Sequence, residues 1–283
     1  MISIVRHLPG VSGSQLLTAA LAATVFCGCA AGPATANRAE PAKSGLTLFL
    51  IGDSTMADKP MIPANPERGW GQLLPMYFRN GVRVENHAVN GESTKSFLDQ
   101  GRWAMVTNRL KPGDYVIIQF GHNDEKQYNT RLYAEPFGSF KTNLTRYVLE
   151  TRDHQAIPVL ATPVARRKFN DQGNLIDTHG DYVPAVRQVA REQHVPLLDL
   201  NCQSAGLLTR LGPDSSKRLF DWIPAGEFAG HPKGLSDDTH FNAYGASRIC
   251  DLAIVEIETN APALAAWLKP YPAAHDRAVG RPR

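Results

Sequence analysis

The sequence carries little net charge of either sign, and this limits the partners that it can have. Its formal net charge is +3, with 30 Lys and Arg residues against 27 Asp and Glu, and the basic residues are scattered along the 283 positions. Such a chain lacks the concentrated basic face of a nucleic-acid-binding domain, so we expect no nucleic acid partner. With 43% hydrophobic residues, no internal repeat and no low-complexity tract, the composition is typical of one soluble domain with a substantial core.

Several catalytic motifs are absent as well. The sequence contains no Gly-x-Ser-x-Gly elbow, no phosphate-binding loop and no His-Glu-x-x-His zinc motif. We therefore expect chemistry that needs neither a metal nor a cofactor.

Cysteine is scarce, and only two of the four cysteines lie outside the N-terminal segment. In an oxidising compartment these two, Cys202 and Cys250, could form a disulfide. The alternative is two separate buried thiols. A sequence does not give the distance between two Cα atoms, so both interpretations stay open.

The N-terminal segment predicts an export signal over residues 1–36. A basic start at Arg6 precedes the apolar stretch Leu16–Phe26, which is too short to form a membrane-spanning helix. Small residues follow, and Ala34-Thr35-Ala36 fits a cleavage site. A second interpretation is a lipoprotein signal in which Cys29 carries the lipid anchor. We expect a periplasmic or extracellular protein, or an outer-membrane lipoprotein if Cys29 is acylated.

Apolar runs alternate with helical patterns over residues 45–270, between a polar linker at 37–44 and a polar tail at 271–283. The predicted strands cover Leu46–Ile51, Val82–Val89, Tyr115–Phe120, Pro158–Thr162 and Pro196–Leu200. The predicted helices cover Gly71–Arg79, Ser96–Leu110, Ser139–Thr151, Asp181–Gln193 and Asn242–Glu256. This order predicts an α/β fold, a three-layer α/β/α sandwich around a mainly parallel five-stranded sheet. Two loop-like stretches, Arg166–Gly180 and Gly212–Ser236, are long enough to wall a substrate groove.

Polar residues that suit acyl-transfer chemistry follow the predicted strands. Ser54 ends the first strand in a Gly-Asp-Ser-Thr turn, at the sheet edge where open α/β sheets bind ligands, and is a candidate nucleophile. Gly91, beyond the second strand, can offer its N–H to a ligand, and Asn123, beyond the third, can donate from its amide. Near the C-terminus, Asp237 and His240 have a spacing that lets a carboxylate reach an imidazole across a helical turn.

The order of these residues resembles the conserved blocks of the SGNH (GDSL-type) hydrolase family over nearly the whole chain after the leader. Finer matches resemble its rhamnogalacturonan acetylesterase branch: Gly52-Asp53-Ser54-Thr55-Met56, Asn86-His87-Ala88, Phe120-Gly121-His122-Asn123-Asp124 and Asp238-Thr239-His240-Phe241. The resemblance implies a flavodoxin-like fold and a serine esterase that removes acetyl groups from esterified pectin. One departure is Glu92, where this branch often has Arg. We expect a solvated loop acid there, and its effect on substrate preference stays open.

The resemblance also implies a role for each residue. Ser54 attacks the acetyl group to form an acetyl-serine, His240 is the general base, and Asp237 orients it. The backbone N–H groups of Ser54 and Gly91 and the side-chain amide of Asn123 form an oxyanion hole. Further candidates for contacts with the substrate are His122, Arg166 and Trp222.

We expect a monomer whose partner is an acetylated polysaccharide or oligosaccharide. Two alternatives remain, an esterase for another acetylated glycan or small acyl ester, and a non-catalytic carbohydrate-binding protein on the same scaffold. The polar, charged loops argue against a lipase. The presence of every expected catalytic residue argues against a non-catalytic protein.

Overall fold

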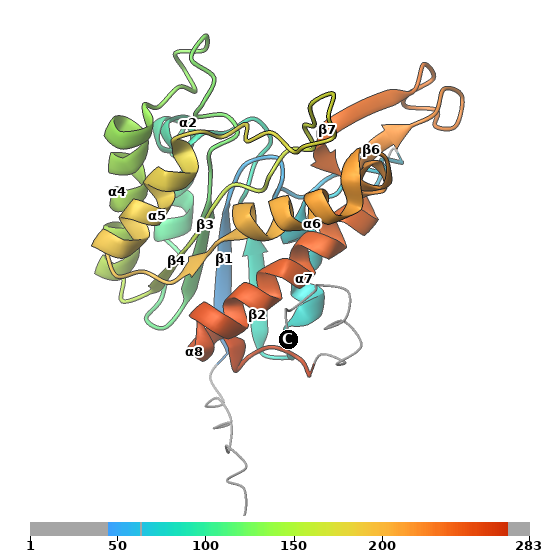
Figure 1. Cartoon of the computed structure of the whole chain (residues 1–283). Helices are drawn as coiled ribbons and strands as arrows, with labels where there is room; N and C mark the ends of the chain where they lie inside the picture. The colour runs from blue at the N-terminus through green and yellow to red at the C-terminus, as the bar shows by residue number, and fades with distance from the viewer. Residues whose placement is uncertain (1–44, 63, 271–283) are drawn as a thin grey trace, which may run out of the picture. The chain divides into compact units, whose positions relative to one another are not determined.

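Five parallel strands form the central sheet, in the order β2-β1-β3-β4-β5 (Figure 1). The computed structural model describes residues 45–62 and 64–270, which lie in one compact unit. The strands are β1 Leu46–Gly52, β2 Val82–Asn86, β3 Tyr115–Gln119, β4 Ile157–Ala161 and β5 Leu197–Leu198. Each overlaps a predicted strand, and Leu50 of β1 pairs with Asn86 on one side and Ile117 on the other. The prediction of a parallel five-stranded sheet is confirmed.

Helices cover both faces of the sheet, which gives the predicted three-layer sandwich (Figure 1). Along β1, Leu48 and Leu50 enter one hydrophobic cluster while Phe49 and Ile51 enter the other, because successive side chains of a strand point to opposite faces. The first cluster packs against α1, α6, α7 and α8, and the second against α2 to α5. These helices are α1 Trp70–Leu73, α2 Thr94–Asp99, α3 Arg102–Thr107, α4 Lys141–Asp153, α5 Tyr182–Glu192, α6 Leu200–Ser215, α7 Ala243–Asn260 and α8 Pro262–Ala265.

Several predicted elements differ in detail from the observed ones. The helix expected over Ser96–Leu110 is divided into α2 and α3 at Gly101, whose φ of +67° an ordinary helix cannot contain. The helix expected from Gly71 gives way to a 3₁₀ turn, Leu74–Tyr77, because Pro75 has no N–H to continue the ladder. A single π-helical turn, Pro136–Phe140, precedes α4.

About half of the stretch expected as a loop over Gly212–Ser236 forms helical turns and strands, and residues 224–234 form a loop. The stretch holds the end of α6, the 3₁₀ turn Ser216–Leu219 and the strand β6 (Phe220–Ile223). An antiparallel partner, β7 (Leu235–Phe241), completes a hairpin that projects beyond the carboxyl ends of the sheet strands (Figure 1). This hairpin carries the C-terminal candidate residues Asp237 and His240 on β7.

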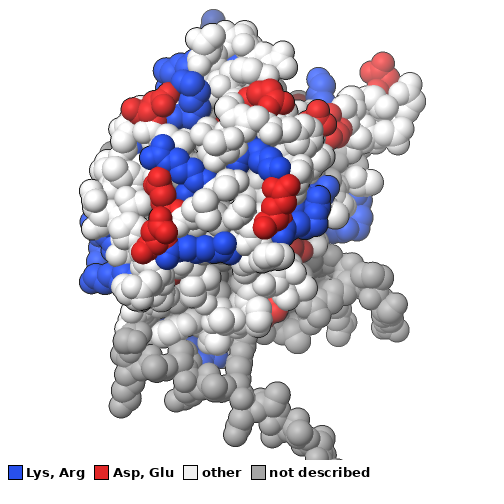
Figure 2. Space-filling view, turned by 90° about the vertical axis from the view of Figure 1, so that its left-hand side faces the viewer, with Lys and Arg blue, Asp and Glu red and all other residues white. Residues whose placement is uncertain are grey.

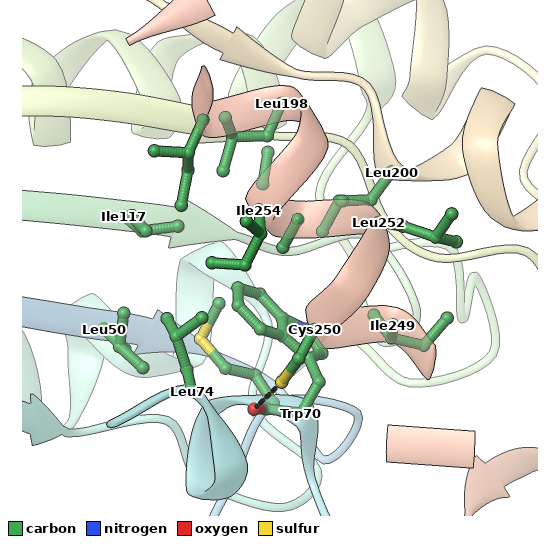
Figure 3. Packing of buried hydrophobic residues seen from close by; sticks show 14 of the residues in the cluster. Leu50, Trp70, Leu74, Ile117, Leu198, Leu200, Ile249, Cys250, Leu252 and Ile254 are labelled. Carbon is green, nitrogen blue, oxygen red and sulfur yellow. Dashed lines mark hydrogen bonds between the residues drawn. The ribbon is translucent and has the colours of Figure 1, made fainter. Parts of the chain in front are cut away.

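The two cysteines of the domain do not form a disulfide. Cys250 lies on α7 inside the first hydrophobic cluster, where its thiol donates a hydrogen bond to the carbonyl oxygen of Trp70 at 3.0 Å (Figure 3). Cys202 lies on the exposed side of α6, and both thiols are free. The disulfide interpretation is therefore wrong, because one side chain faces the core and the other faces solvent. The alternative of two buried thiols holds for Cys250 only.

The face of the molecule covered by α4 and α5 carries charges of both signs side by side (Figure 2). Many are paired, as in the ion pairs of Arg146 with Glu150 at 2.6 Å and of Lys141 with Glu192 at 2.8 Å. This face therefore offers no continuous field of one sign to a polyanion.

The predicted leader at 1–36, the linker at 37–44 and the tail at 271–283 lie outside the described residues. Within residues 45–62 and 64–270, none of the helices combines the length and the apolar character that crossing a membrane requires.

Candidate active site

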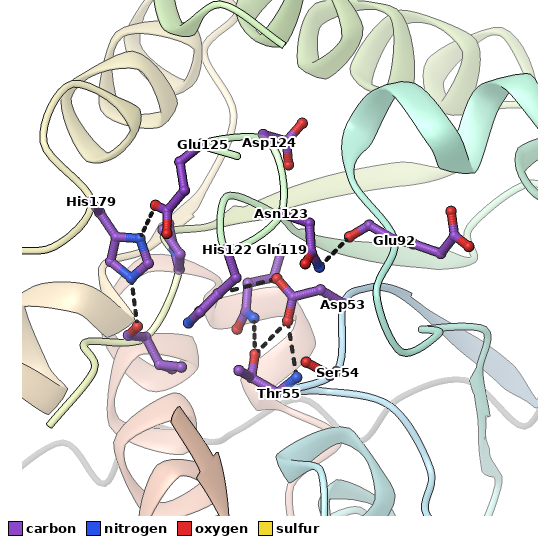
Figure 4. A network of polar contacts seen from close by, with 12 residues as sticks. Asp53, Ser54, Thr55, Glu92, Gln119, His122, Asn123, Asp124, Glu125 and His179 are labelled. Carbon is purple, nitrogen blue, oxygen red and sulfur yellow. Dashed lines mark hydrogen bonds and ion pairs between the residues drawn. The ribbon is translucent and has the colours of Figure 1, made fainter. Parts of the chain in front are cut away.

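Ser54 lies in the turn that follows β1, at the carboxyl edge of the sheet. Asp53 shapes this turn, because its Oδ1 accepts hydrogen bonds from the backbone N–H of Thr55 at 2.9 Å and from the Thr55 hydroxyl at 2.8 Å (Figure 4). Gln119 at the end of β3 donates to the same hydroxyl at 2.7 Å. No helix follows the nucleophile directly, so Asp53 stabilises a turn rather than a helix terminus.

The hydroxyl of Ser54, the imidazole of His240 and the carboxylate of Asp237 form one continuous chain of hydrogen bonds. The Oγ atom of Ser54 is 2.8 Å from Nε2 of His240, and Nδ1 of the same ring is 2.7 Å from Oδ2 of Asp237. A carboxylate accepts only, so Nδ1 carries the proton and Nε2 is left to accept from the serine. The structure thus brings together three residues that span 186 positions of the chain.

The carboxylate and the imidazole shift each other's pKa in opposite directions. Burial would raise the pKa of Asp237, but hydrogen bonds from His240 and the charge of that ring outweigh burial and lower it to about 2. Burial would lower the pKa of His240, but the hydrogen bond and the charge of Asp237 outweigh burial and raise it. At neutral pH Asp237 is ionised, and His240 is a stronger base than a free imidazole.

A β-bulge, and not the expected helical turn, brings Asp237 to His240. Four residues of β7, from Asp237 to His240, stand opposite Asp221 of β6 alone, so the strand curls out of the hairpin. The Oδ1 atom of Asp237 holds the curl by accepting from the backbone N–H groups of Thr239 at 2.7 Å and His240 at 2.9 Å. The helical-turn interpretation is wrong, but the three-residue spacing still lets the carboxylate reach the imidazole.

Arg167 fastens this bulge to the body of the domain. Its backbone N–H donates to the carbonyl oxygen of Asp238 at 2.8 Å, and its guanidinium contacts the Asp238 carboxylate at 2.5 Å. The same guanidinium donates to the carbonyl oxygen of Pro213 and lies over the ring of Trp222. Arg167 is only 7% exposed, so it stabilises the hairpin and is not displayed to solvent.

Trp222, a predicted substrate contact, lies on β6 with its ring partly exposed. Its indole N–H donates to Asp238 at 3.0 Å, and the charged groups of Arg167 and Lys217 lie 4.9 and 4.8 Å from its ring. Two cations therefore lie against the ring of this candidate substrate contact. Its contact with a substrate stays a prediction.

Three hydrogen-bond donors of the predicted oxyanion hole lie at the sheet edge. The backbone N–H groups of Ser54 and Gly91 have no acceptor within the described ranges. Gly91 has a φ of +78°, a conformation that glycine adopts without strain. Asn123 is buried and donates one amide hydrogen to the carbonyl oxygen of Glu92 at 2.9 Å, which leaves its second hydrogen without an acceptor in this part of the chain (Figure 4).

Glu92 is buried and is not the solvated loop acid that we expected. Its carboxylate accepts hydrogen bonds from the hydroxyl of Ser96 at 2.5 Å and from the amide of Gln100 at 3.0 Å. Ser96 lies in the first turn of α2 and Gln100 directly follows the helix, so the carboxylate is held against α2. The hydrogen bond from Asn123 goes to the backbone of Glu92 and not to its carboxylate.

His122, a predicted substrate contact, is buried beside the nucleophile turn. Its Nδ1 donates to Oδ2 of Asp53 at 3.2 Å, and its ring packs edge-on against His179 at 4.6 Å. Burial lowers the pKa of His122 to about 4, so the ring is neutral at pH 7. Burial would raise the pKa of Asp53, but His122 and the hydrogen bonds from Thr55 lower it to about 2. His122 is 3% exposed and supports the turn from inside.

Arg166, the third predicted contact, lies in a cluster that the sequence did not reveal. Its guanidinium pairs with Glu125 at 2.5 Å and donates to the hydroxyl of Thr178 and the carbonyl oxygen of His122, both at 3.2 Å. Glu125 also accepts from Nδ1 of His179 at 2.9 Å. Arg166 lines a cavity of about 260 Å³ between the loop that carries it and α6.

Asp221 is a further buried acid that sequence reasoning missed. It is 3% exposed, opposite the bulge, and its Oδ1 has no hydrogen-bond partner among the described residues. Burial, together with the charges of Glu67 and Asp237, raises its pKa to about 7. No local motif signals this residue, because its environment arises from the pairing of β6 with β7.

The described residues contain no group of three or more His, Cys, Asp or Glu side chains placed to hold a metal ion. The site therefore presents a hydroxyl, a paired imidazole and a set of N–H donors, which together suit nucleophilic acyl transfer.

Both the sequence and the fold are similar to those of known proteins. The chain is 40% identical to the rhamnogalacturonan acetylesterase RhgT of Bacillus subtilis over 216 residues, which cover 76% of this chain and 91% of RhgT. It is 26% identical to a rhamnogalacturonan acetylesterase of Emericella nidulans over 247 residues, 79% of this chain and 89% of the relative.

A solved structure agrees with these sequence matches. The crystal structure of YxiM of Bacillus subtilis is 27% identical, with a TM-score of 0.65 over 76% of this chain and 57% of YxiM. Residues 50–248 match the GDSL-like lipase/acylhydrolase family, a range that includes every residue of the hydrogen-bonded chain. The chain is a member of the GDSL-like lipase/acylhydrolase family.

Proposed function

We propose that this chain is a serine esterase that removes O-acetyl groups from rhamnogalacturonan, the acetylated backbone of pectin. The observation that carries the activity is the continuous chain of hydrogen bonds from Ser54 through His240 to Asp237 beside unused N–H donors. The names of RhgT and of the Emericella nidulans relative support the substrate.

The geometry supports a two-step reaction. His240 takes the proton of Ser54 through Nε2 while the serine oxygen attacks the acetyl carbonyl carbon, and the negative charge moves to the carbonyl oxygen. The N–H groups of Ser54 and Gly91 and the free amide hydrogen of Asn123 would stabilise that oxyanion. The bond between the acetyl carbon and the sugar oxygen then breaks, and His240 gives its proton to that oxygen, so the sugar leaves as an alcohol. A water molecule activated by the same ring hydrolyses the acetyl-serine and releases acetate.

Acetate release tests the proposal. We expect the protein to release acetate faster from acetylated rhamnogalacturonan than from acetylated xylan, and Ser54→Ala to abolish release from both. Faster release from xylan would refute the substrate but not the esterase. Folded wild-type protein that releases no acetate, hydrolyses no p-nitrophenyl acetate and resists labelling by a fluorophosphonate would identify a non-catalytic binding protein.

We also propose that the protein is exported and acts as a monomer. A polysaccharide of the plant cell wall is too large to enter a bacterial cell intact, which agrees with the export signal predicted over residues 1–36. The mass of the mature protein checks this. Cleavage after Ala36 gives a soluble product, whereas diacylglycerol on Cys29 gives a lipoprotein. Light scattering of the mature protein measures its oligomeric state.

A further inference from the structure

We infer that Lys126 is a positioning residue for the oxyanion hole, acting through the side-chain amide of Asn123. The inference rests on the proposed esterase activity and adds a residue to it. Its basis is a hydrogen bond of 2.7 Å from Nζ of Lys126 to Oδ1 of Asn123, three residues earlier in the same turn.

Two hydrogen bonds determine how the amide of Asn123 is oriented. Lys126 can only donate, so the atom that faces it is the amide oxygen. The carbonyl oxygen of Glu92 can only accept, so the atom 2.9 Å from it is the amide nitrogen. With the oxygen and one hydrogen engaged, the amide cannot flip without losing both contacts. Its second hydrogen is thereby kept available at the carboxyl edge of the sheet.

Among the described residues, no carboxylate neutralises the charge of Lys126. Other cations around the site are paired, Lys59 with Glu67 at 2.6 Å and Arg166 with Glu125 at 2.5 Å. No carboxylate forms an ion pair with Lys126 in the part of the chain that the structure describes. Its positive charge therefore acts on the amide and on the oxyanion that forms beside it.

The physical effect is twofold. A cation bound to the amide oxygen withdraws electron density, which makes the N–H groups of Asn123 stronger donors. The same charge, one amide away from the oxyanion, favours the transition state over the neutral ester. Because both effects stabilise the charged transition state more than the neutral ester, loss of Lys126 should lower kcat and leave KM nearly unchanged.

The test is a double-mutant cycle on p-nitrophenyl acetate, a substrate with no carboxylate for a lysine to bind. We expect Lys126→Met to lower kcat about 10-fold, less than the ~10²–10³-fold typical for loss of a whole oxyanion donor. Lys126→Arg should retain at least about half of the wild-type kcat, because a guanidinium can still donate to the amide oxygen. In an Asn123→Ala background, Lys126→Met should cost less than about 3-fold, because the effect through the amide is gone and only the direct effect of the charge on the oxyanion is left.

Lys95→Met is the matched control. It removes the same charge from α2, where Lys95 pairs with Asp99, and we expect an unchanged kcat. Equal losses from Lys126→Met with and without Asn123 would overturn the inference, and so would no loss in the wild-type background. If Lys126→Met changes the melting temperature, the same double-mutant cycle is repeated with Lys126→Gln. A wild-type protein without turnover would refute the proposed esterase activity itself. An active wild-type protein whose kcat is unchanged by Lys126→Met would refute only the role of Lys126.

Discussion

Replacing Asp237 with asparagine should damage the enzyme more than replacing it with alanine, although asparagine has the closer shape. The reason lies in the two oxygens of the carboxylate. Oδ1 accepts from two backbone N–H groups, at 2.7 and 2.9 Å, while Oδ2 accepts from Nδ1 of His240. An asparagine must place its carbonyl oxygen at the two N–H groups. Its NH₂ group then faces the imidazole.

That amide would force the wrong tautomer on His240. A donor facing Nδ1 requires Nδ1 to accept, so the proton moves to Nε2 and the ring can no longer take the proton of Ser54. When a catalytic imidazole is held with its proton on Nε2, kcat typically falls by about 10⁴-fold. Alanine removes the charge-assisted hydrogen bond to the ring, worth about 1.5–3 kcal/mol or roughly 10- to 150-fold, but leaves the tautomer free. It also removes the acceptor of the Thr239 and His240 backbone N–H groups, a loss that we expect to lower the melting temperature.

The assay is the hydrolysis of p-nitrophenyl acetate by Asp237→Asn and Asp237→Ala at one pH, with melting temperatures measured in parallel. Asp214→Asn makes the same chemical change at a side chain that is 91% exposed, and it should retain wild-type turnover. We expect the asparagine variant to be slower than the alanine variant by about 10-fold or more. An asparagine variant as active as the alanine variant, or more active, would refute the tautomer argument.

Three further predictions concern titration, packing and thiols. Because Asp237 raises the pKa of His240 above 6.5 and the base must be neutral, kcat/KM should rise with pH through a midpoint above that value, and a flat profile between pH 5 and 8 would contradict this. In Gly245→Ala the new Cβ would lie 1.8 Å from the carbonyl oxygen of Leu219, so we expect a loss of about 1–3 kcal/mol, seen as a lower melting temperature in circular dichroism. Cys202→Ser should leave the melting temperature unchanged, because this exposed thiol is free. A reducing agent should not change the melting temperature of the wild-type protein either; a shift with reductant would indicate a disulfide.

The central strands could be predicted from the sequence because each is a buried apolar run whose character is local. The predicted run Leu46–Ile51 differs from β1 by one residue. The last strand was predicted too long, over Pro196–Leu200, because its apolar residues continue into α6. Asp199 separates the two elements by capping that helix, with its carboxylate accepting from Cys202 at 3.4 Å. Asp199 is visible in the sequence, but the apolar residues on both sides of it make the strand and the start of the helix look like one continuous run.

The surroundings of the site were harder to predict than its members. Ser54, Gly91 and Asn123 each follow a strand, and parallel strands end at one edge, so their convergence follows from the topology. The hairpin cannot be found in this way, because the bulge exists only through the pairing of β7 with β6. We expected Glu92 in solvent because its contacts with α2 depend on how the chain turns between Glu92 and that helix.

The two halves of the site therefore depend on the fold in different ways. The nucleophile and the oxyanion donors are anchored to the central sheet, whereas Asp237 and His240 stand on a two-stranded hairpin outside it. A two-stranded ribbon is marginally stable alone, so the 2.8 Å contact between His240 and Ser54 needs an external support. Arg167 contributes to this support by binding both the backbone and the side chain of Asp238, next to Asp237. A buried arginine that contacts neither Ser54 nor His240 thus helps to keep the two side chains aligned.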